Sequence, residues 1–230
     1  MLKCQFHIHV SGDPEHYHSY SAQNLIKKAK QLNYDVLAIT CHNKVIFTKA
    51  LQNYAKEHNI ILISGAEISI GKKHVLCINI DQEIENIHTF SALREYKKNH
   101  PDCLIIAPHP FFPGKNTLKE ALIEHIDIFD AIEHSFCYTT TKNYNSKAMK
   151  LAEKFAKPVV ATSDCHFLKD LDLGYTLVDS QKNITSIIRA IKQNKTAISH
   201  SPIGYFRIFK TLTTMILASL IKKIFRLQKV

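Results

Sequence analysis

Two pairs of metal-binding side chains stand two residues apart in this sequence. His7 and His9 end the apolar run Cys4 to His9, and Asp164 and His166 follow the apolar run Val159 to Ser163. Because alternate residues of a β-strand point to the same face, both members of each pair face one side of the strand. Three more such residues follow other predicted strands, namely His42, Glu67 and His109.

These seven positions predict one shared site. In α/β barrels and open α/β sheets, ligands bind at the carboxyl ends of the strands, so side chains placed there converge. A single histidine at a strand end is more often a structural residue, but seven positions on the same edge are hard to explain that way. Imidazole and carboxylate donors without thiolate are typical of Zn, Mn or Fe sites that keep positions open for water.

The elements that must position these residues alternate along the chain. Short β-branched runs are separated by helical patterns, which predicts βα units around a mostly parallel sheet. Helices are expected over Ala22 to Leu32, with Ser21 as N-cap, and over Asn145 to Phe155, and a hairpin is expected at Gly71-Lys72-Lys73. The expected strands are Cys4 to His9, Asp35 to Thr40, Ile60 to Ser64, His74 to Ile80, Leu104 to Ala107, Ile128 to Glu133 and Val159 to Ser163.

Length and composition indicate one enzyme-sized domain. With 230 residues, 45% of them hydrophobic, the chain can build one barrel core of about seven strands, with an open doubly wound sheet as the alternative. The six cysteines are scattered singly, and the first residues do not form a signal peptide, so a cytoplasmic location is expected.

The net charge of +10 is concentrated in the last 26 residues, which weakens a nucleic-acid interpretation. Residues 205–230 hold six Lys or Arg and no acid, which leaves 24 basic and 20 acidic side chains in residues 1–204. We therefore divide the chain into one main domain over residues 1–204 and a basic amphipathic C-terminal helix over residues 205–230. No apolar run there reaches the roughly twenty residues needed to span a bilayer. Packing or dimerisation and peripheral membrane contact remain the alternatives for this helix, and the oligomeric state is open.

Five short strings, in this order, resemble the PHP family, which is named for polymerase and histidinol phosphatase. They are HIHV, ITCHN, GAEIS, APHPF and SDCH, and the resemblance runs from about Phe6 to Ile198. It implies a distorted (β/α)7 barrel, similar to a TIM barrel, with up to three divalent metal ions of Zn, Mn or Fe. The run SDCHFLKDLDLGYT resembles family members that are phosphoesterases.

The resemblance also implies a ligand set. One ion would be held by His7, His9, Glu67 and Asp164, with Glu67 bridging to a second ion that His74 and His109 complete. A third ion would be held by His18, His42 and His166. Asp13 is the alternative to His18 as the ligand from this loop.

Three positions depart from the family pattern. Gln5 and Cys41 stand where family members usually carry aspartates, and the asparagine often found after the sixth strand is not evident at Glu133-His134-Ser135. The first two departures remove carboxylates that could orient imidazoles, so one metal site is expected to be weaker or to select another ion.

The implied reaction is hydrolysis of a phosphate mono- or diester by a metal-activated water, with no protein nucleophile. A phosphorylated small molecule, a nucleotide or a nucleic-acid end remains open as substrate. Lys44 is a candidate contact for the substrate phosphate, and no general acid is assigned, although His134, Cys41 and a metal-bound water are candidates. Two other functions remain open: an amidohydrolase-like hydrolase, and a non-catalytic, metal-bound module that binds nucleic acid.

Overall fold

The computed structural model describes residues 1–210, 213 and 214. Their strands form two sheets of five strands each. The first sheet has the order β10-β9-β1-β2-β3, in which β1 pairs parallel with β2 and antiparallel with β9. Its strands are β1 (Leu2–Gln5), β2 (Val36–Ala38), β3 (Ile61–Ile63), β9 (Gly174–Val178) and β10 (Thr196–His200).

The second sheet follows chain order. It runs β4-β5-β6-β7-β8. β5 pairs antiparallel with both β4 and β6, whereas β7 pairs parallel with both β6 and β8. Its strands are β4 (Gly65–Ile70), β5 (Lys73–Ile78), β6 (Leu104–Ala107), β7 (Ala131–Ser135) and β8 (Val159–Thr162).

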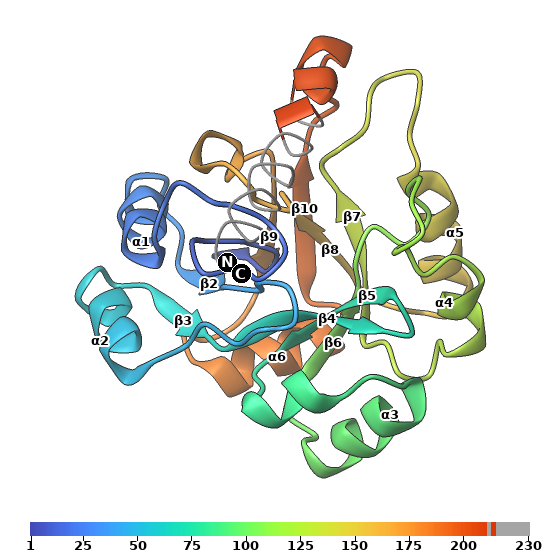
Figure 1. Cartoon of the computed structure of the whole chain (residues 1–230), viewed down its shortest axis with the longest axis horizontal. Helices are drawn as coiled ribbons and strands as arrows, with labels where there is room; N and C mark the ends of the chain where they lie inside the picture. The colour runs from blue at the N-terminus through green and yellow to red at the C-terminus, as the bar shows by residue number, and fades with distance from the viewer. Residues whose placement is uncertain (211–212, 215–230) are drawn as a thin grey trace, which may run out of the picture.

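Within residues 1–204, six α-helices lie around the two sheets. Figure 1 shows α1 and α2 beside the first sheet and α3, α4 and α5 beside the second. Side-chain caps begin several of them: Ser21 and Asn24 form a capping box at α1, and Asn183 accepts from Ser186 N–H at α6. The helices are α1 (Ala22–Gln31), α2 (Lys49–Glu57), α3 (Phe90–Asn99), α4 (Glu120–Glu124), α5 (Asn145–Lys154) and α6 (Ile184–Lys192), with 3₁₀ turns at Gln82–Asn86 and Leu168–Asp170.

Two isolated β-bridges join the sheets, and both lie beside the predicted site residues. Ile8 bridges Cys165 just beyond β1 and β8, and His42 bridges Glu67 between the segment after β2 and strand β4. The backbone bonds at the first bridge are His9 N–H to Cys165 O and Cys165 N–H to His7 O, both 3.0 Å. The contact between the two sheets therefore lies at the predicted metal ligands.

Three apolar clusters hold the fold together. One packs α1 and α2 on the first sheet, and a second packs α3, α4 and α5 on the second sheet. The third draws residues from both sheets and from α6, whose Ile187 and Ile191 are fully buried. Burial of this apolar surface supplies most of the driving force that keeps the two sheets together.

The α/β class is confirmed, but the sheets differ from the expected single barrel. The described strands pair in two five-stranded sheets, with four parallel and four antiparallel pairs, so the expectation of a mostly parallel sheet was wrong. One antiparallel pair, β4 with β5, is the hairpin at Gly71 and Lys72, whereas β5 with β6 and β9 with β10 are antiparallel although a helix connects them. The closed seven-stranded barrel stays a prediction.

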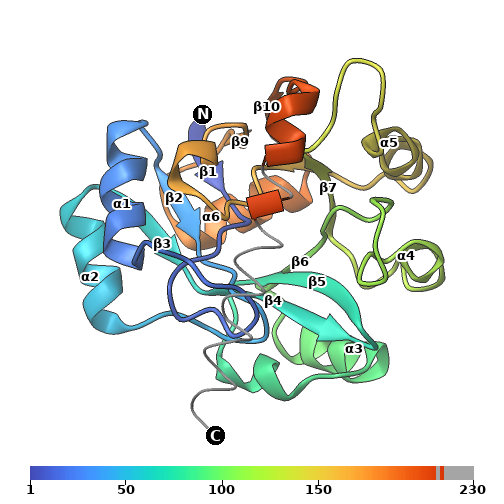
Figure 2. The ribbon, with the colours of Figure 1, turned by 45° about the horizontal axis from the view of Figure 1, so that its top comes forward.

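The predicted basic C-terminal helix lies mostly outside the described residues. Residues 205–210, 213 and 214 are helical, and the remaining part of residues 205–230 is not described. Across residues 1–210, 213 and 214, no helix combines the length and the apolar character needed to cross a membrane. Figure 2 shows the short helical segment that begins at residue 205 beside the loop that joins β7 to α5.

Candidate metal centre

Glu67 lies at the centre of a group of five imidazoles. It is 1% exposed on β4, within the hairpin whose second strand begins next to His74. Its Oε2 lies 3.3, 3.5 and 3.2 Å from the Nε2 atoms of His7, His9 and His42. Its Oε1 lies 2.8 Å from His74 Nδ1 and 3.2 Å from His109 Nε2. The two carboxylate oxygens therefore face two different sets of histidines.

Asp164 provides a second carboxylate on the same side. Its Oδ1 lies 3.3 Å from the Nε2 atoms of both His7 and His9. Asp164 and His109 have positive φ angles of 40° and 30°, a region that non-glycine residues rarely occupy. Such backbone strain concentrates at functional sites, where the surrounding structure holds it in place.

His18 and His166 extend the group beyond His9. The ligand atoms of His9, His18 and His166 lie within 4.8 Å of one another. His18 comes from the loop before α1, and its ring centroid is 5.3 Å from that of His166. His166 Nδ1–H donates to the Asp164 carbonyl at 2.9 Å. All nine residues predicted as metal ligands are thus part of one continuous cluster.

Two further carboxylates hold the imidazoles from outside. Asp13 Oδ2 lies 3.0 Å from His9 Nδ1 and 2.9 Å from His42 Nδ1, and it also accepts from the His42 backbone N–H. Glu133, fully buried on β7, lies 2.8 Å from His7 Nδ1 and accepts from the His109 backbone N–H. The Thr162 hydroxyl on β8 donates to the same glutamate.

The position of Asp13 bears on the open choice of loop ligand. Because Asp13 Oδ2 already accepts three hydrogen bonds, it is placed to orient imidazoles. His18 Nε2, in contrast, is buried and has no hydrogen-bond partner within the part of the chain that the structure describes. This geometry favours His18 as the ligand.

The chemistry of these donors fits bound cations. A carboxylate can only accept, so the Nδ1 atoms of His7, His9 and His42 donate to Glu133 or Asp13. Their Nε2 atoms also face a carboxylate, Glu67 or Asp164, so either a second ring proton or a bound cation must lie between the two groups. The Nε2 atoms of His7, His9, His18 and His166 are buried without a hydrogen-bond partner among the described residues. Buried acceptors facing one another are costly unless a cation lies between them.

The electrostatics of the cluster agree with this. Burial disfavours a charged His7, yet the carboxylates of Asp164, Glu67 and Glu133 hold its pKa well above the ordinary value. Burial likewise opposes charge on His9, but Asp13 and Asp164 raise its pKa to about 9. Burial also opposes ionisation of Glu67 and Asp164, while the surrounding histidines hold the pKa of each carboxyl well below its usual range. The ionised carboxylates of the cluster therefore stabilise positive charge placed among them.

Gln5 and Cys41, which stand where the PHP pattern has aspartates, do not contact the histidine rings among the described residues. Gln5 donates to the carbonyls of Leu171 and Gly174 and accepts from Ser163 N–H, so it fixes backbone and no histidine. Cys41 is buried and contacts the Val10 backbone. Asp13 and Glu133 supply the orienting carboxylates instead. The sequence signal for Glu133 was a charged residue inside a predicted strand, which our interpretation overlooked.

Two other candidates are placed differently. Lys44 is exposed, and its contact with substrate stays a prediction. His134 is wrong as a general acid for this cluster, because successive residues of β7 alternate between faces and Glu133 occupies the face toward His7. The His134 ring stacks on His200 of β10, with ring centroids 3.8 Å apart.

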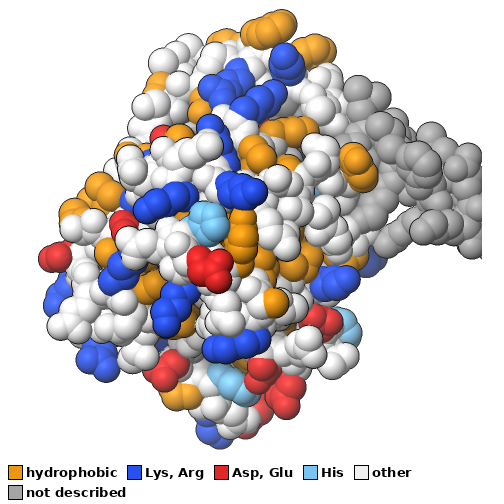
Figure 3. Space-filling view, turned by 90° about the vertical axis from the view of Figure 1, so that its left-hand side faces the viewer, with side chains coloured by type: hydrophobic (Ala, Val, Ile, Leu, Met, Phe, Trp, Pro, Cys, Tyr) orange, Lys and Arg blue, Asp and Glu red, His pale blue; other side chains and the backbone are white. Residues whose placement is uncertain are grey.

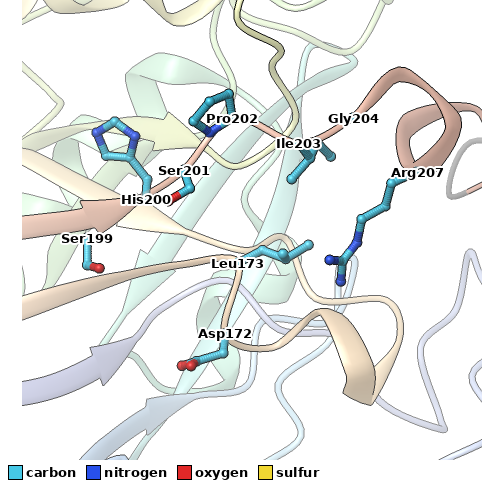
Figure 4. Close-up of a pocket in the computed structure, with 9 residues that line it drawn as sticks. All are labelled: Asp172, Leu173, Ser199, His200, Ser201, Pro202, Ile203, Gly204 and Arg207. Atoms are coloured by element: carbon cyan, nitrogen blue, oxygen red, sulfur yellow. The ribbon is translucent and has the colours of Figure 1, made fainter.

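A second group of titratable residues surrounds His134. Tyr138 OH lies 2.6 Å from His200 Nδ1, and burial lowers the pKa of His134 to about 4. Beside His200 is a cavity of about 320 Å³, into which Arg207 points in Figure 4 while the His200 ring turns away. Arg207 donates to the buried Asp170 at 2.7 Å, so its charge is already partnered.

Positive charge is spread over the face that carries α1 and α2. Figure 3 shows Lys and Arg scattered there among uncharged and hydrophobic side chains, with no continuous basic stripe. This face therefore lacks the electrostatic pattern of a groove that tracks a nucleic-acid backbone.

Comparisons with known proteins agree with the motifs. Residues 142–196 match the family model described as PHP-associated. An uncharacterised protein of Methanocaldococcus jannaschii is 26% identical over 117 residues, which are 47% of this chain and 66% of that protein. The chain thus spans slightly less than two thirds of this relative.

Two solved structures share the fold. One is a Bacteroides vulgatus two-domain protein containing a predicted PHP-like metal-dependent phosphoesterase, with a TM-score of 0.64 and 19% identity, covering 93% of this chain and 69% of the other. The second is the lesion-specific endonuclease Q of Pyrococcus furiosus, with a TM-score of 0.58 and 15% identity, covering 86% of this chain and 57% of the endonuclease. Together with the family model, these matches confirm the resemblance to the PHP family.

Proposed function

We propose that this chain is a metal-dependent phosphoesterase that hydrolyses a phosphate mono- or diester. The observation that carries the proposal is Glu67, whose two oxygens face two separate sets of histidines 2.8–3.5 Å away. A carboxylate in this position is suited to bridge two cations.

The ligand groups follow the family pattern. His7, His9, Glu67 and Asp164 would hold one ion, and Glu67, His74 and His109 a second. His18, His42 and His166 would hold a third, although His42 also lies 3.2 Å from Glu67 Oε2. The donor set suits Zn, Mn or Fe.

Bound divalent ions would neutralise the phosphate oxygens and lower the pKa of a water for attack at phosphorus. The protein supplies the arrangement: Glu133 and Asp13 fix the tautomer and ring orientation of His7, His9 and His42, so their Nε2 atoms are directed inward before substrate arrives. Burial of these groups keeps competing water away and strengthens each electrostatic contact.

A nucleotide or nucleic-acid end is supported as substrate by the likeness to endonuclease Q, and a small phosphorylated metabolite fits the same cluster. An amidohydrolase-like reaction is less well supported. That architecture typically relies on a carboxylated lysine at the bridging position, and here Glu67 is surrounded by five histidines.

The test combines elemental analysis of the purified protein with a panel of phosphate esters and cyclic amides. We expect bound Zn, Mn or Fe and release of phosphate, and we expect Asp164→Ala and His109→Ala to lose metal and more than about 100-fold of the activity while keeping their circular dichroism. His88→Ala, an exposed histidine outside the cluster, is the matched control and should retain both.

Three results would contradict the proposal. They are hydrolysis of cyclic amides alone, oligonucleotide binding without turnover in a calorimetric titration, and full activity of both cluster variants.

A further inference from the structure

A cavity of about 360 Å³ with mainly apolar walls lies where β6 and β7 lead out of the sheet. This volume falls in the range of small-molecule pockets. Its walls come from the segment after His109, the loop between β7 and α5, and the short helical segment at residues 205–208. The aromatic residues among them are Phe112, Tyr144 and Tyr205.

The pocket adjoins the histidine cluster through the backbone. Phe112 N–H donates to the His109 carbonyl at 3.1 Å, so the aromatic wall begins three residues from a proposed ligand. Cys137 also lines the pocket, and burial together with the Asp164 carboxylate raises the pKa of its thiol to about 11. A phosphate at the cluster would therefore have its ester substituent within reach of this pocket.

The walls are fixed by specific contacts. The rings of Phe112 and Tyr144 are 5.3 Å apart between centroids, at an interplanar angle of 51°. Tyr144 precedes Asn145, whose side chain bonds both the N–H and the carbonyl of Ser135 at 2.9 Å, which ties the start of α5 to β7. Tyr205 OH is hydrogen-bonded to the Thr141 hydroxyl.

The rim of the pocket is polar and basic. In a tight turn, the Thr139 N–H donates to the Lys142 carbonyl and the Lys142 N–H donates to the Thr139 hydroxyl. The exposed Lys142 ammonium lies 5.1 Å from the centroid of the Tyr144 ring. Aromatic walls with a cationic rim are the features that hold flat π-systems next to phosphate.

We propose that this pocket binds a planar aromatic ring carried by the substrate, stacked on Phe112, Tyr144 or Tyr205, while the phosphate occupies the histidine cluster. The inference rests on the proposed phosphoesterase function. A nucleobase and a simple aryl group share this chemistry, and the pocket predicts that either is preferred to an aliphatic substituent of similar size.

The experiment compares adenosine monophosphate, phenyl phosphate and glycerol phosphate on the full-length protein as purified. We expect a higher kcat/KM for the two aromatic esters, and we expect Tyr205→Ala and Phe112→Ala to lower that value about tenfold while glycerol phosphate changes less than twofold. Phe206→Ala is the matched control, because Phe206 is adjacent to Tyr205, 79% exposed and not part of the pocket wall.

A binding measurement separates this inference from the proposed function. Adenosine, which has no phosphate, should show saturation transfer from the wild-type protein in NMR, and Phe112→Ala should weaken that signal. Adenosine binding without turnover of any ester would overturn the phosphoesterase proposal and leave the pocket assignment standing.

Two outcomes would overturn the pocket assignment. One is an equal loss on all three esters in the Tyr205→Ala and Phe112→Ala variants, and the other is turnover of all three with no aromatic preference and no adenosine signal. A preference for adenosine monophosphate over phenyl phosphate would identify the ring as a nucleobase, and the reverse order would identify an aryl group.

Discussion

Glu133 and His134 are neighbours on β7, yet they belong to two very different groups of histidines. On one face of the strand, Glu133 contacts His7, and carboxylates hold the rings of the cluster with their Nε2 atoms inward. On the other face, His134 stacks on His200, whose partner is the hydroxyl of Tyr138. Both groups are buried and rich in imidazole.

The difference lies in the carboxylates. Beside Asp13 and Asp164, His9 has a pKa raised to about 9 despite burial, whereas burial lowers the pKa of His134 to about 4. A buried histidine therefore becomes a good candidate for a metal ligand when a carboxylate fixes its Nδ1 proton, and it behaves as a neutral packing residue when only rings surround it.

Removal of the metal ions should destabilise the cluster around Glu67 and leave the group around His134 unchanged, and this is the largest expected difference between the two groups. Ligand binding at about one hundred times the dissociation constant stabilises a protein by about 3 kcal/mol, so chelation should lower Tm by roughly 5–10 °C. Scanning calorimetry with and without chelator measures this change. Amide hydrogen exchange should rise in β4 and residues 163–166 and stay unchanged in β10. A chelated protein with unaltered Tm would show that the cluster does not depend on cations.

Substitution of the two β7 neighbours comes next in size. Glu133→Gln should weaken metal affinity and lower activity about 10- to 100-fold, because the amide no longer holds His7 as a charged acceptor. His134→Gln should change both by less than twofold. Metal titrations and steady-state kinetics on the two variants measure these changes. Equal losses of metal affinity and activity in both variants would contradict the different roles assigned to the two faces of β7.

A third difference between the two groups concerns the pH dependence of stability. His134 is neutral in the folded protein down to about pH 4, while an unfolded histidine takes up a proton near pH 6.5. Between these values the unfolded state binds more protons, so the free energy of unfolding falls as pH decreases, by up to about 1.4 kcal/mol per pH unit. His134→Gln should flatten the slope between pH 6.5 and 4 in urea unfolding. An unchanged slope would mean that His134 is protonated in the fold.

Much of the site could be predicted because its residues follow strong local signals. The helices α1 and α5 and the strand β6 were predicted to within one residue, since apolar periodicity and the Ser21 cap define them. His7, His9, His42, Glu67, His109, Asp164 and His166 could be placed at one edge because strand direction fixes where strand ends meet. These positions lie together in the structure.

Other parts depend on contacts that no local pattern records. Strands β4, β9 and β10 were not predicted. β4 contains Glu67 and Ser69 among its apolar residues, and β10 is only partly buried. β9 can pack against β8 because Gly174 has no side chain; a Cβ there would lie 2.8 Å from the Thr162 carbonyl oxygen. Glu133 was not assigned because its partner His7 is 126 residues away in the sequence. Asp13 was considered only as an alternative metal ligand, and its hydrogen bonds to His9 and His42 show instead that it orients imidazoles.

The two isolated bridges at Ile8 and His42 have a mechanical consequence. Each couples a residue of one sheet to a residue of the other within one position of a proposed ligand, so the sheets cannot move apart there without pulling the donor atoms away from one another. Cations bound here would hold the two sheets together. Separation of the sheets at these bridges would then be coupled to release of the ions.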